Sequence, residues 1–390
     1  MGILKRLFGQ DNITVSGYKM ITEQGDGFYS YNGNLYSSDI VRSCIRPKTQ
    51  AVGKAVGKHI RESKNNILVN PDAYIKFLLE EPNPYMSGQM LLEKLTNQLS
   101  LNNNAFALIQ RDLNGIANSI YPINSNSVEA LENKQGELFL KFLIKGKYYT
   151  FKYSDIIHLR RDFNTNDIFG ENPAVALTQL MEIVTTTDQG IIKAIKNSNI
   201  IKWLLKFHNT LREEDIKRNT KEFVDSFLRI DSENAGAAAT DAKFDAQQVE
   251  PKNYVPGSDQ TKNTIDRIYS FFNTNNEIVQ SKYSEDQWIS YYEAEIEPVL
   301  VQLSNEFTRK LFSRRERGFG NKIIFESSNL SFASMQTKLR LVAFVDRGIM
   351  NPDEVRAILN FAPIPDGLGQ KYIRRLDTEE IERSDEKNDY

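Results

Sequence analysis

The chain has 390 residues, too many for one small compact domain, and 40% of them are hydrophobic, which is enough to build a core. Its 49 basic and 51 acidic residues give a formal charge of −2, so the total charge excludes a general affinity for polyanions. The single cysteine, Cys44, excludes a disulfide framework and a thiolate metal cage. Met1–Phe8 is too short and too charged for a signal peptide, and no apolar run reaches the roughly 18 residues that cross a bilayer. We therefore expect a soluble, intracellular protein without membrane contact.

Signatures of enzymes are weak. Asp155 and His158 stand close enough to share a metal, but they lie in a strand-like run, and an ordinary half-buried histidine is favoured. Gly53–His59 looks like a phosphate loop, yet three residues separate its glycines where four are needed, and a histidine replaces the metal-binding hydroxyl. We expect no catalytic residues, no cofactor and no metal.

The first part of the chain predicts helices followed by an antiparallel sheet. Residues 1–36 read as a loose arm with one short strand. Three helices are predicted over Ser37–Glu62, from Asn70 to Leu79, and from a cap at Ser87 to Leu99. Strands are predicted over Asn104–Gln110, Ile116–Pro122, Leu138–Ile144, Tyr148–Tyr153 and Ile156–Arg160, with turns at Asn114-Gly115 and Lys145-Gly146. This order indicates an α+β unit.

From Asn172 the pattern changes to long helices. The predicted elements are a helix over Asn172–Asn199, a strand over Ile200–Phe207, a helix from the Thr210–Glu213 capping box to Ile230, a strand over Ala242–Val249 and a helix from Ser258 to Phe272. Asn273–Lys282 is polar and turn-like, with an extended tripeptide inside.

The capping box Ser284–Gln287 opens the longest periodic run of the chain, and Pro298 lies inside its apolar face, so we expect a kink there. A strand over Lys322–Glu326 and helices over Met335–Arg347 and from Asn351 to Leu359 follow. The last residues, 377–390, carry seven acidic and two basic side chains, which predicts a disordered tail.

Several short sequence motifs accompany this order of elements. They are Glu81-Pro-Asn-Pro84, Leu101-Asn-Asn-Asn-Ala-Phe106, Gly115 through Tyr121-Pro122-Ile123, Ile157-His158-Leu159-Arg160, Phe169-Gly170-Glu171-Asn172-Pro173, Glu297-Pro298-Val299-Leu300, Asp346-Arg-Gly348, Met350-Asn-Pro-Asp-Glu354-Val-Arg356 and Pro363-Ile-Pro-Asp-Gly367. Together, over roughly residues 35–370, the sequence resembles the HK97-type portal proteins of tailed bacteriophages.

This resemblance implies a portal-like α+β fold. Its expected parts are a flexible arm (1–36), an α+β wing (37–171), a first stem helix (172–199), a small α/β clip (200–257), a second stem helix (258–272), a tunnel loop (273–283), the kinked helix and wing return (284–326), a short helical crown (327–373) and the acidic tail (374–390).

The resemblance also implies a function. A portal forms a ring, dodecameric in this family, at one capsid vertex of the virion and conducts double-stranded DNA during packaging and ejection. The implied partners are further copies of the chain, the terminase large subunit, the major capsid protein or scaffold, a head–tail adaptor, and DNA bound without sequence specificity. Assembly is expected in the cytoplasm of the bacterial host.

A channel that passes DNA needs a polar, weakly charged lining, because tight contacts would stall transport. The residues expected at the tunnel loop are Asn273, Thr274, Asn275, Asn276 and Lys282, and an ordinary surface loop is the competing interpretation. Between Lys193 and Arg229 nine basic and five acidic residues give a local charge of +4. Lys193, Lys196, Lys202 and Lys206 are candidates for rings of positive charge in the channel or clip, against a merely solvated face.

Two further groups have open interpretations. Trp288, Tyr291 and Tyr292 could stack on single-stranded nucleic acid, although their helical spacing favours core or subunit contacts. Arg314–Arg317 is as consistent with solvated charge as with a DNA or subunit contact. Two rival functions remain: another DNA-binding ring of the virion, such as a head–tail adaptor, and an enzyme using Asp155, His158 and Glu171.

Overall fold

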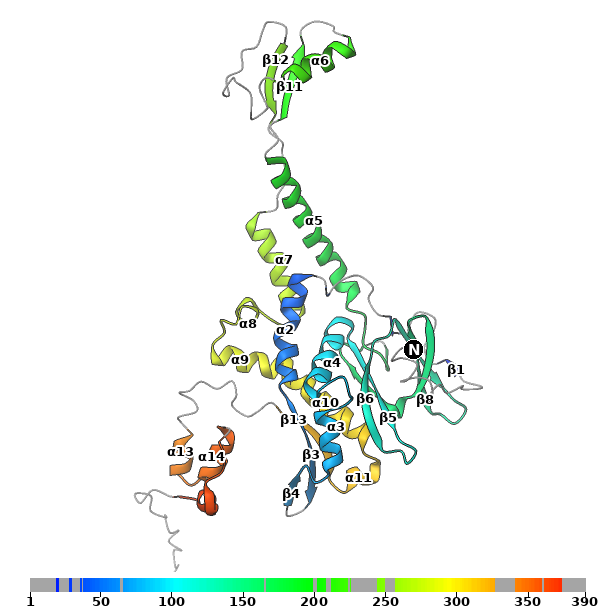
Figure 1. Cartoon of the computed structure of the whole chain (residues 1–390), viewed down its shortest axis with the longest axis vertical. Helices are drawn as coiled ribbons and strands as arrows, with labels where there is room; N and C mark the ends of the chain where they lie inside the picture. Colours follow the sequence, from blue (N-terminus) through cyan, green and yellow to red (C-terminus); the bar gives the residue numbers. More distant parts are fainter. Residues whose placement is uncertain are drawn as a thin grey trace, which may run out of the picture. The chain divides into compact units, whose positions relative to one another are not determined.

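The computed structural model describes residues 19–20, 28–29, 36, 38–63, 66–164, 166–198, 202–207, 212–223, 225, 244–249, 257–326, 341–359 and 361–373. The chain divides into two compact units (Figure 1). Unit 1 comprises Met1–Leu177 and Asp266–Tyr390, and unit 2 comprises Thr178–Ile265. The mixture of helices and small sheets confirms the expected α+β class.

Three helices begin unit 1. They are α2 (Asp39–Gly53), α3 (Ala73–Glu80) and α4 (Gly88–Asn102). Ser87 caps α4 as predicted, since its side chain accepts from the Met90 N–H. The cap of α3 is Asp72 rather than Asn70, because Asn70 has a left-handed φ of 51° and ends the preceding strand.

Three antiparallel sheets belong to unit 1. The first has the order β10 (Ile156–Arg160), β5 (Asn104–Arg111), β6 (Ala117–Ile123). The second has the order β1 (Lys19–Met20), β7 (Ser127–Glu132), β8 (Leu138–Ile144), β9 (Lys147–Lys152), and β2 (Phe28–Tyr29) also pairs with β7. A 3-10 turn, η2 (Tyr153–Asp155), follows β9. The third has the order β13 (Asn321–Glu326), β3 (Val56–Ser63), β4 (Asn66–Val69).

Strand β5 is apolar on both faces because it lies between two cores. Ala107 and Ile109 pack into the larger core with the helices, whereas Phe106 and Leu108 pack into a second core with the five-stranded sheet. Alternate residues of a strand point to opposite faces, so a near-continuous apolar run fits a layer that is covered on both sides. The sheet β10–β5–β6 is therefore the central layer of unit 1.

The prediction of one helix over Ser37–Glu62 is wrong. Helix α2 ends at Gly53, and the chain then forms β3, which pairs with β13 in the register Gly57↔Phe325 and His59↔Ile323. A Cβ at Gly57 would lie 2.9 Å from the Phe325 ring, so this position accommodates a ring from the neighbouring strand. The local apolar spacing suited a helix, but pairing with a distant strand determines the structure.

Unit 2 contains a two-stranded sheet and a short helix. Strands β11 (Lys202–Phe207) and β12 (Phe244–Val249) pair antiparallel, with Phe207 opposite Phe244. Helix α6 (Glu213–Phe223) lies between them in sequence. Two helices cross the boundary between the units, α5 (Ala174–Ser198) and α7 (Ser258–Phe271). These elements agree with the predicted order, although Thr210 and the end expected at Ile230 lie outside the described residues.

The long periodic run after Ser284 is interrupted by a π-helical turn. Helix α9 (Glu285–Tyr291) begins with the predicted capping box and continues into the π-turn η4 (Tyr292–Ile296) and α10 (Glu297–Leu311). Pro298 stands in the first turn of α10 and is exposed, so it does not lie inside the apolar face. The irregularity precedes the proline, whose ring would clash with the carbonyl four residues earlier in a regular helix.

The short helix α8 (Asn276–Val279) precedes α9. The described elements after α10 are α11 (Arg314–Gly318), α13 (Val342–Asp346), α14 (Pro352–Ile358) and the 3-10 segment η5 (Pro365–Gln370), besides β13. Asn351 and Glu354 form the capping box of α14. The expected acidic tail and residues 327–340 lie outside the described residues. Among the described helices, none is long and apolar enough to cross a membrane.

Candidate nucleic-acid interface

The segment expected to face DNA begins where α7 ends. Asn273 has a left-handed φ of 49°, its N–H bonds to the Ser270 carbonyl at 3.1 Å, and the Thr274 N–H bonds to the Tyr269 carbonyl at 2.9 Å. This pair of bonds is a Schellman motif, in which a residue with positive φ satisfies the last carbonyls of a helix. Asparagine tolerates that conformation better than most side chains, so α7 ends at the predicted place.

The segment itself is a short helix rather than an extended loop. Asn275 caps α8 by accepting a hydrogen bond from the Ile278 N–H at 2.9 Å. Ile278 is 2% exposed and belongs to the core of unit 1, where α8 packs against α2. The prediction of a turn-like segment missed this helix because one buried isoleucine is enough to anchor four residues.

Most expected site residues on this segment are accessible. Asn273, Asn275, Asn276 and Lys282 are exposed, whereas the hydroxyl oxygen of Thr274 is buried. The Asn276 side chain accepts from the Gln280 amide at 2.8 Å. Over residues 273–283 the charges are one glutamate and one lysine, so the exposed surface is polar and nearly neutral.

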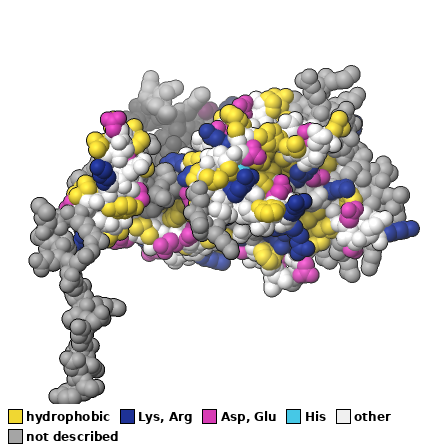
Figure 2. Space-filling view, turned by 90° about the horizontal axis from the view of Figure 1, so that it is seen from below, with side chains coloured by type: hydrophobic (Ala, Val, Ile, Leu, Met, Phe, Trp, Pro, Cys, Tyr) yellow, Lys and Arg dark blue, Asp and Glu magenta, His cyan; other side chains and the backbone are white. Residues whose placement is uncertain are grey.

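The four candidate lysines lie on two elements. Lys193 is exposed on α5, and Lys206 is exposed on β11, where it pairs in register with Asp245. Lys196 and Lys202 lie on the same two elements, and their side chains are outside the description. Figure 2 shows the chain from below relative to Figure 1; on that face basic, acidic and apolar side chains are mixed.

The aromatic residues of α9 and the start of η4 belong to the core, which is the interpretation that their helical spacing favoured. Tyr291 is 7% exposed, and Trp288 and Tyr292 pack against the same core. The Trp288 ring stacks on Tyr283 with centroids 4.8 Å apart. These rings therefore support the start of α9 rather than form an exposed platform.

Two phrases of the sequence meet in space. The Asn103 amide donates to the Glu171 carbonyl at 2.9 Å, and the Asn104 side chain bonds both the N–H and the carbonyl of Gly170, each at 2.9 Å. These contacts fix Gly170 and Glu171, shortly before α5 begins. Their role could not be read from either phrase alone, because the two phrases are 66 residues apart.

The residues of the enzyme hypothesis are engaged in structural contacts. His158 is 2% exposed, stacks on Phe106 at 4.5 Å and bonds Asn104 through Nε2 at 3.1 Å. Burial, followed by the charges of Arg160 and Lys310, holds the pKa of His158 well below its usual value. Asp155 pairs with Arg111 at 2.8 Å. Among the described residues, no group of three histidines, cysteines or carboxylates could hold a metal.

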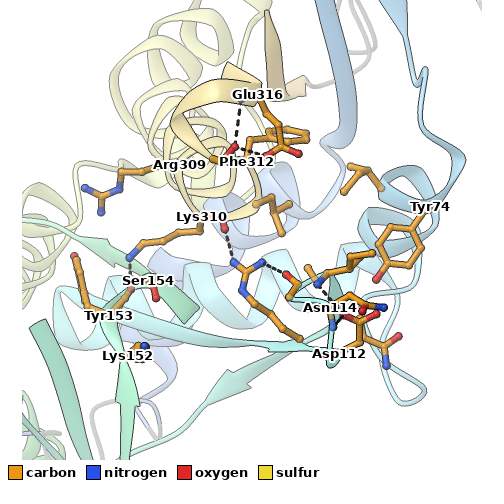
Figure 3. A pocket seen from close by; sticks show the side chains of 18 of the residues that line it. Tyr74, Asp112, Asn114, Lys152, Tyr153, Ser154, Arg309, Lys310, Phe312 and Glu316 are labelled. Carbon is orange, nitrogen blue, oxygen red and sulfur yellow. Dashed lines mark hydrogen bonds between the residues drawn. The ribbon is translucent and has the colours of Figure 1, made fainter. Parts of the chain in front are cut away.

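A pocket of about 1110 Å³ opens between α3, the β5–β6 turn and the junction of α10 with α11 (Figure 3). Several of the charged groups that line it are bonded to the protein itself. The Lys310 ammonium donates to the Tyr153 carbonyl, and Arg111 donates to the Lys310 carbonyl at 2.7 Å. Burial lowers the pKa of Lys310 to about 8. In α11, Ser313 and Glu316 form a capping box that orients the run Arg314–Arg317. These interactions tie several of its lining side chains to the neighbouring elements.

Comparison with solved structures shows which known proteins share this fold. The fold is similar to a chain from the neck of an empty gene transfer agent particle computed with C6 symmetry, with a TM-score of 0.66 and 13% identity over 87% of this chain and 96% of that one. The neck of the native particle computed with C12 symmetry gives 0.65 and 13% over 88% and 97%. An HK97 family phage portal protein from Corynebacterium diphtheriae gives 0.50 and 10% over 79% and 98%. The fold is thus that of a virion neck or portal subunit.

The family follows from the sequence. Residues 39–360 match the family of phage portal proteins, so the chain belongs to that family. No curated protein sequence matches the chain. The family is structural rather than enzymatic, and the protein forms a portal ring of the virion, at the capsid vertex where DNA is packaged. The resemblance inferred from the phrases of the sequence is confirmed.

Proposed function

We propose that residues 273–283 line the channel of a twelve-subunit ring and contact double-stranded DNA without sequence specificity. The observation that carries this proposal is a polar, nearly neutral surface on a segment that Ile278 anchors in the core. Exposed amides at Asn275 and Asn276 offer transient hydrogen bonds to phosphates, and a single lysine, Lys282, adds one positive charge. Such a surface guides a polyanion without holding it.

The other parts take the roles that the family implies. Residues 200–257 form the clip that faces the terminase large subunit, with Lys193, Lys196, Lys202 and Lys206 as the basic residues of the channel or clip. Residues 37–171 form the wing and 327–373 the crown, which contact the capsid protein or scaffold. A head–tail adaptor binds after packaging, and the ring assembles in the cytoplasm of the bacterial host. The 12-fold ring is supported by the C12 symmetry of the similar neck structure.

A charge test addresses the channel surface. The double variant Asn275→Asp, Asn276→Asp adds two negative charges at exposed positions, and aspartate preserves the helix cap at residue 275. We expect slower packaging, most strongly at low salt, because screening weakens the repulsion between carboxylate and phosphate. Ring assembly should not change.

The matched control places two negative charges elsewhere on unit 1. Asn114 and Asn118 are exposed on the β5–β6 hairpin, so Asn114→Asp with Asn118→Asp changes the total charge equally. Packaging should remain at wild-type rates in this control. Wild-type rates for the 275/276 variant at every salt concentration would place this segment away from the DNA path.

A further inference from the structure

A buried carboxylate lies beside the start of the channel segment. Glu295 is 4% exposed and accepts hydrogen bonds from three other elements of unit 1. Lys48 of α2 donates to Oε1 at 2.6 Å, and Asn273 donates to Oε2 at 3.2 Å. Arg161, which follows β10, donates to both oxygens, to Oε2 at 3.3 Å. One side chain thus joins a helix, a wing loop and the end of α7.

Two cationic side chains, those of Lys48 and Arg161, contact the Glu295 carboxylate. Lys48 is 2% exposed, and burial lowers its pKa while the charge of Glu295 raises it again. Asp162, 3.8 Å from Arg161, supplies a second negative charge to the group. A buried ion pair is weak evidence for stability, because an apolar pair of similar size is often as stable. The role of this cluster is better explained by the geometry that it imposes.

The position of Glu295 depends on the π-turn. Glu295 lies within Tyr292–Ile296, where one extra residue per turn changes the direction of the following side chains by about 100° relative to a regular helix. π-turns are often found at functional sites. Here the turn presents the carboxylate to Asn273, the residue with positive φ that ends α7.

We propose that Glu295 is a positioning residue for the channel segment: by binding Asn273, it fixes where α7 ends and hence where Asn275 and Asn276 point. This inference rests on the proposed function of residues 273–283. The segment then has two anchors. Ile278 holds its middle in the core, and Glu295 holds its first residue against α2 and the wing loop. Loss of the second anchor changes the orientation of the segment without removing it from the core.

The test uses single charges at two neighbouring positions. Asn273→Asp keeps the size of the side chain and tolerates a positive φ, but it places a carboxylate against Glu295. Asn276→Asp adds the same charge three residues later, where the side chain is exposed and bonds to Gln280 rather than to Glu295. In assembled full-length rings, we expect hydrogen exchange of amides 274–282 to be at least 10-fold faster in Asn273→Asp and within twofold of wild type in Asn276→Asp.

An exchange variant restores the contact at position 273 alone. In Asn273→Asp with Glu295→Gln, amide and carboxylate trade places, so a donor again faces an acceptor at this contact, while Lys48 and Arg161 lose their carboxylate partner. We expect this double variant to recover at least part of the lost protection and packaging rate. Asn273→Gly accepts a positive φ but has no side chain to bind Glu295, so amides 274–282 should lose part of their protection from exchange. This variant replaces Asn273→Asp in the test if the charged variant fails to fold.

The outcomes distinguish this inference from the proposed function. Equal exchange rates of amides 274–282 in Asn273→Asp and Asn276→Asp would overturn the positioning role of Glu295. If exchange behaves as expected but packaging is unaffected in every variant, Glu295 positions the segment and the segment does not contact DNA. Slower packaging in both single variants, with faster exchange only in Asn273→Asp, supports both proposals.

Discussion

Asn104 and Gly170 are joined by a pair of reciprocal hydrogen bonds, in which the Gly170 N–H donates to Oδ1 and Nδ2 donates to the Gly170 carbonyl, each at 2.9 Å. The side chain of Asn104 is 1% exposed. It therefore satisfies both backbone groups of a residue that has no strand partner of its own, just before α5 begins. The same Oδ1 lies 3.1 Å from His158 Nε2, which extends the pair into the second core.

Replacement of Asn104 should destabilise unit 1. Asn104→Asp keeps the shape but turns the donor to the Gly170 carbonyl into a second acceptor, and it buries a charge. We expect a loss of about 3 kcal/mol in the free energy of unfolding, in line with buried polar groups that lose their partners. Urea unfolding of the wild type and the variant measures this change. A loss below 0.5 kcal/mol would show that the pair is dispensable.

Gly170 should not tolerate a side chain. A Cβ there would lie 2.2 Å from the Arg161 carbonyl oxygen and 2.4 Å from that of Asn103, and backbone atoms move less easily than side chains. Gly170→Ala should therefore cost more than about 2 kcal/mol, a range typical of overpacking. Gly318→Ala is the matched control, because nothing lies within 4 Å of its Cβ and alanine favours the helix α11. Thermal unfolding should shift strongly in the first variant only; similar shifts would refute the steric argument.

His158 should make the protein sensitive to mild acid. Its folded pKa is well below 6.5, so below pH 6.5 the unfolded chain binds a proton that the folded chain does not. Stability contributed by the neutral ring is complete above pH 6.5 and falls with decreasing pH, by about 1.4 kcal/mol per pH unit. His158→Gln still donates to Asn104 but does not titrate, so its stability should change less between pH 6.5 and 5. Parallel pH profiles of the two proteins in urea titrations would contradict this role.

Pro298→Ala tests whether the π-turn depends on the proline. Alanine restores an N–H and removes the clash with the preceding turn, so a regular helix becomes accessible at Tyr292–Ile296. Because Glu295 lies in that turn, a regular helix would move its carboxylate away from Lys48. We expect impaired ring assembly or packaging, measured by electron microscopy and a packaging assay. Normal rings and normal packaging would show that buried contacts alone maintain the turn.

Local signals in the sequence were sufficient for most elements. The capping boxes at Ser284 and Asn351 and the cap at Ser87 appear as predicted, because a cap depends only on residues three positions apart. The hairpins at Asn114-Gly115 and Lys145-Gly146 also follow from their turn residues. Strands β4 and β7 were missed.

Long-range pairings could not be predicted in the same way. Strand β3 was expected to be helical from its local apolar spacing. Its partner β13 follows more than 250 residues later, so no local signal indicated the pairing. The cluster at Glu295 was missed for a similar reason: Lys48 is 247 residues away and Arg161 is 134 residues away. Each of these residues alone resembles an ordinary surface charge. Only the fold places them on one carboxylate.

Electron cryomicroscopy of the purified, assembled protein tests most directly whether this chain forms a DNA-conducting ring. We predict closed rings, twelve-fold as in the similar neck structure, with a central hole about as wide as a DNA duplex. Asn275 and Asn276 should face that hole in every subunit. A ring whose centre is closed, or whose hole is lined by other residues while 273–283 lie on the outer surface, would contradict the channel that we propose.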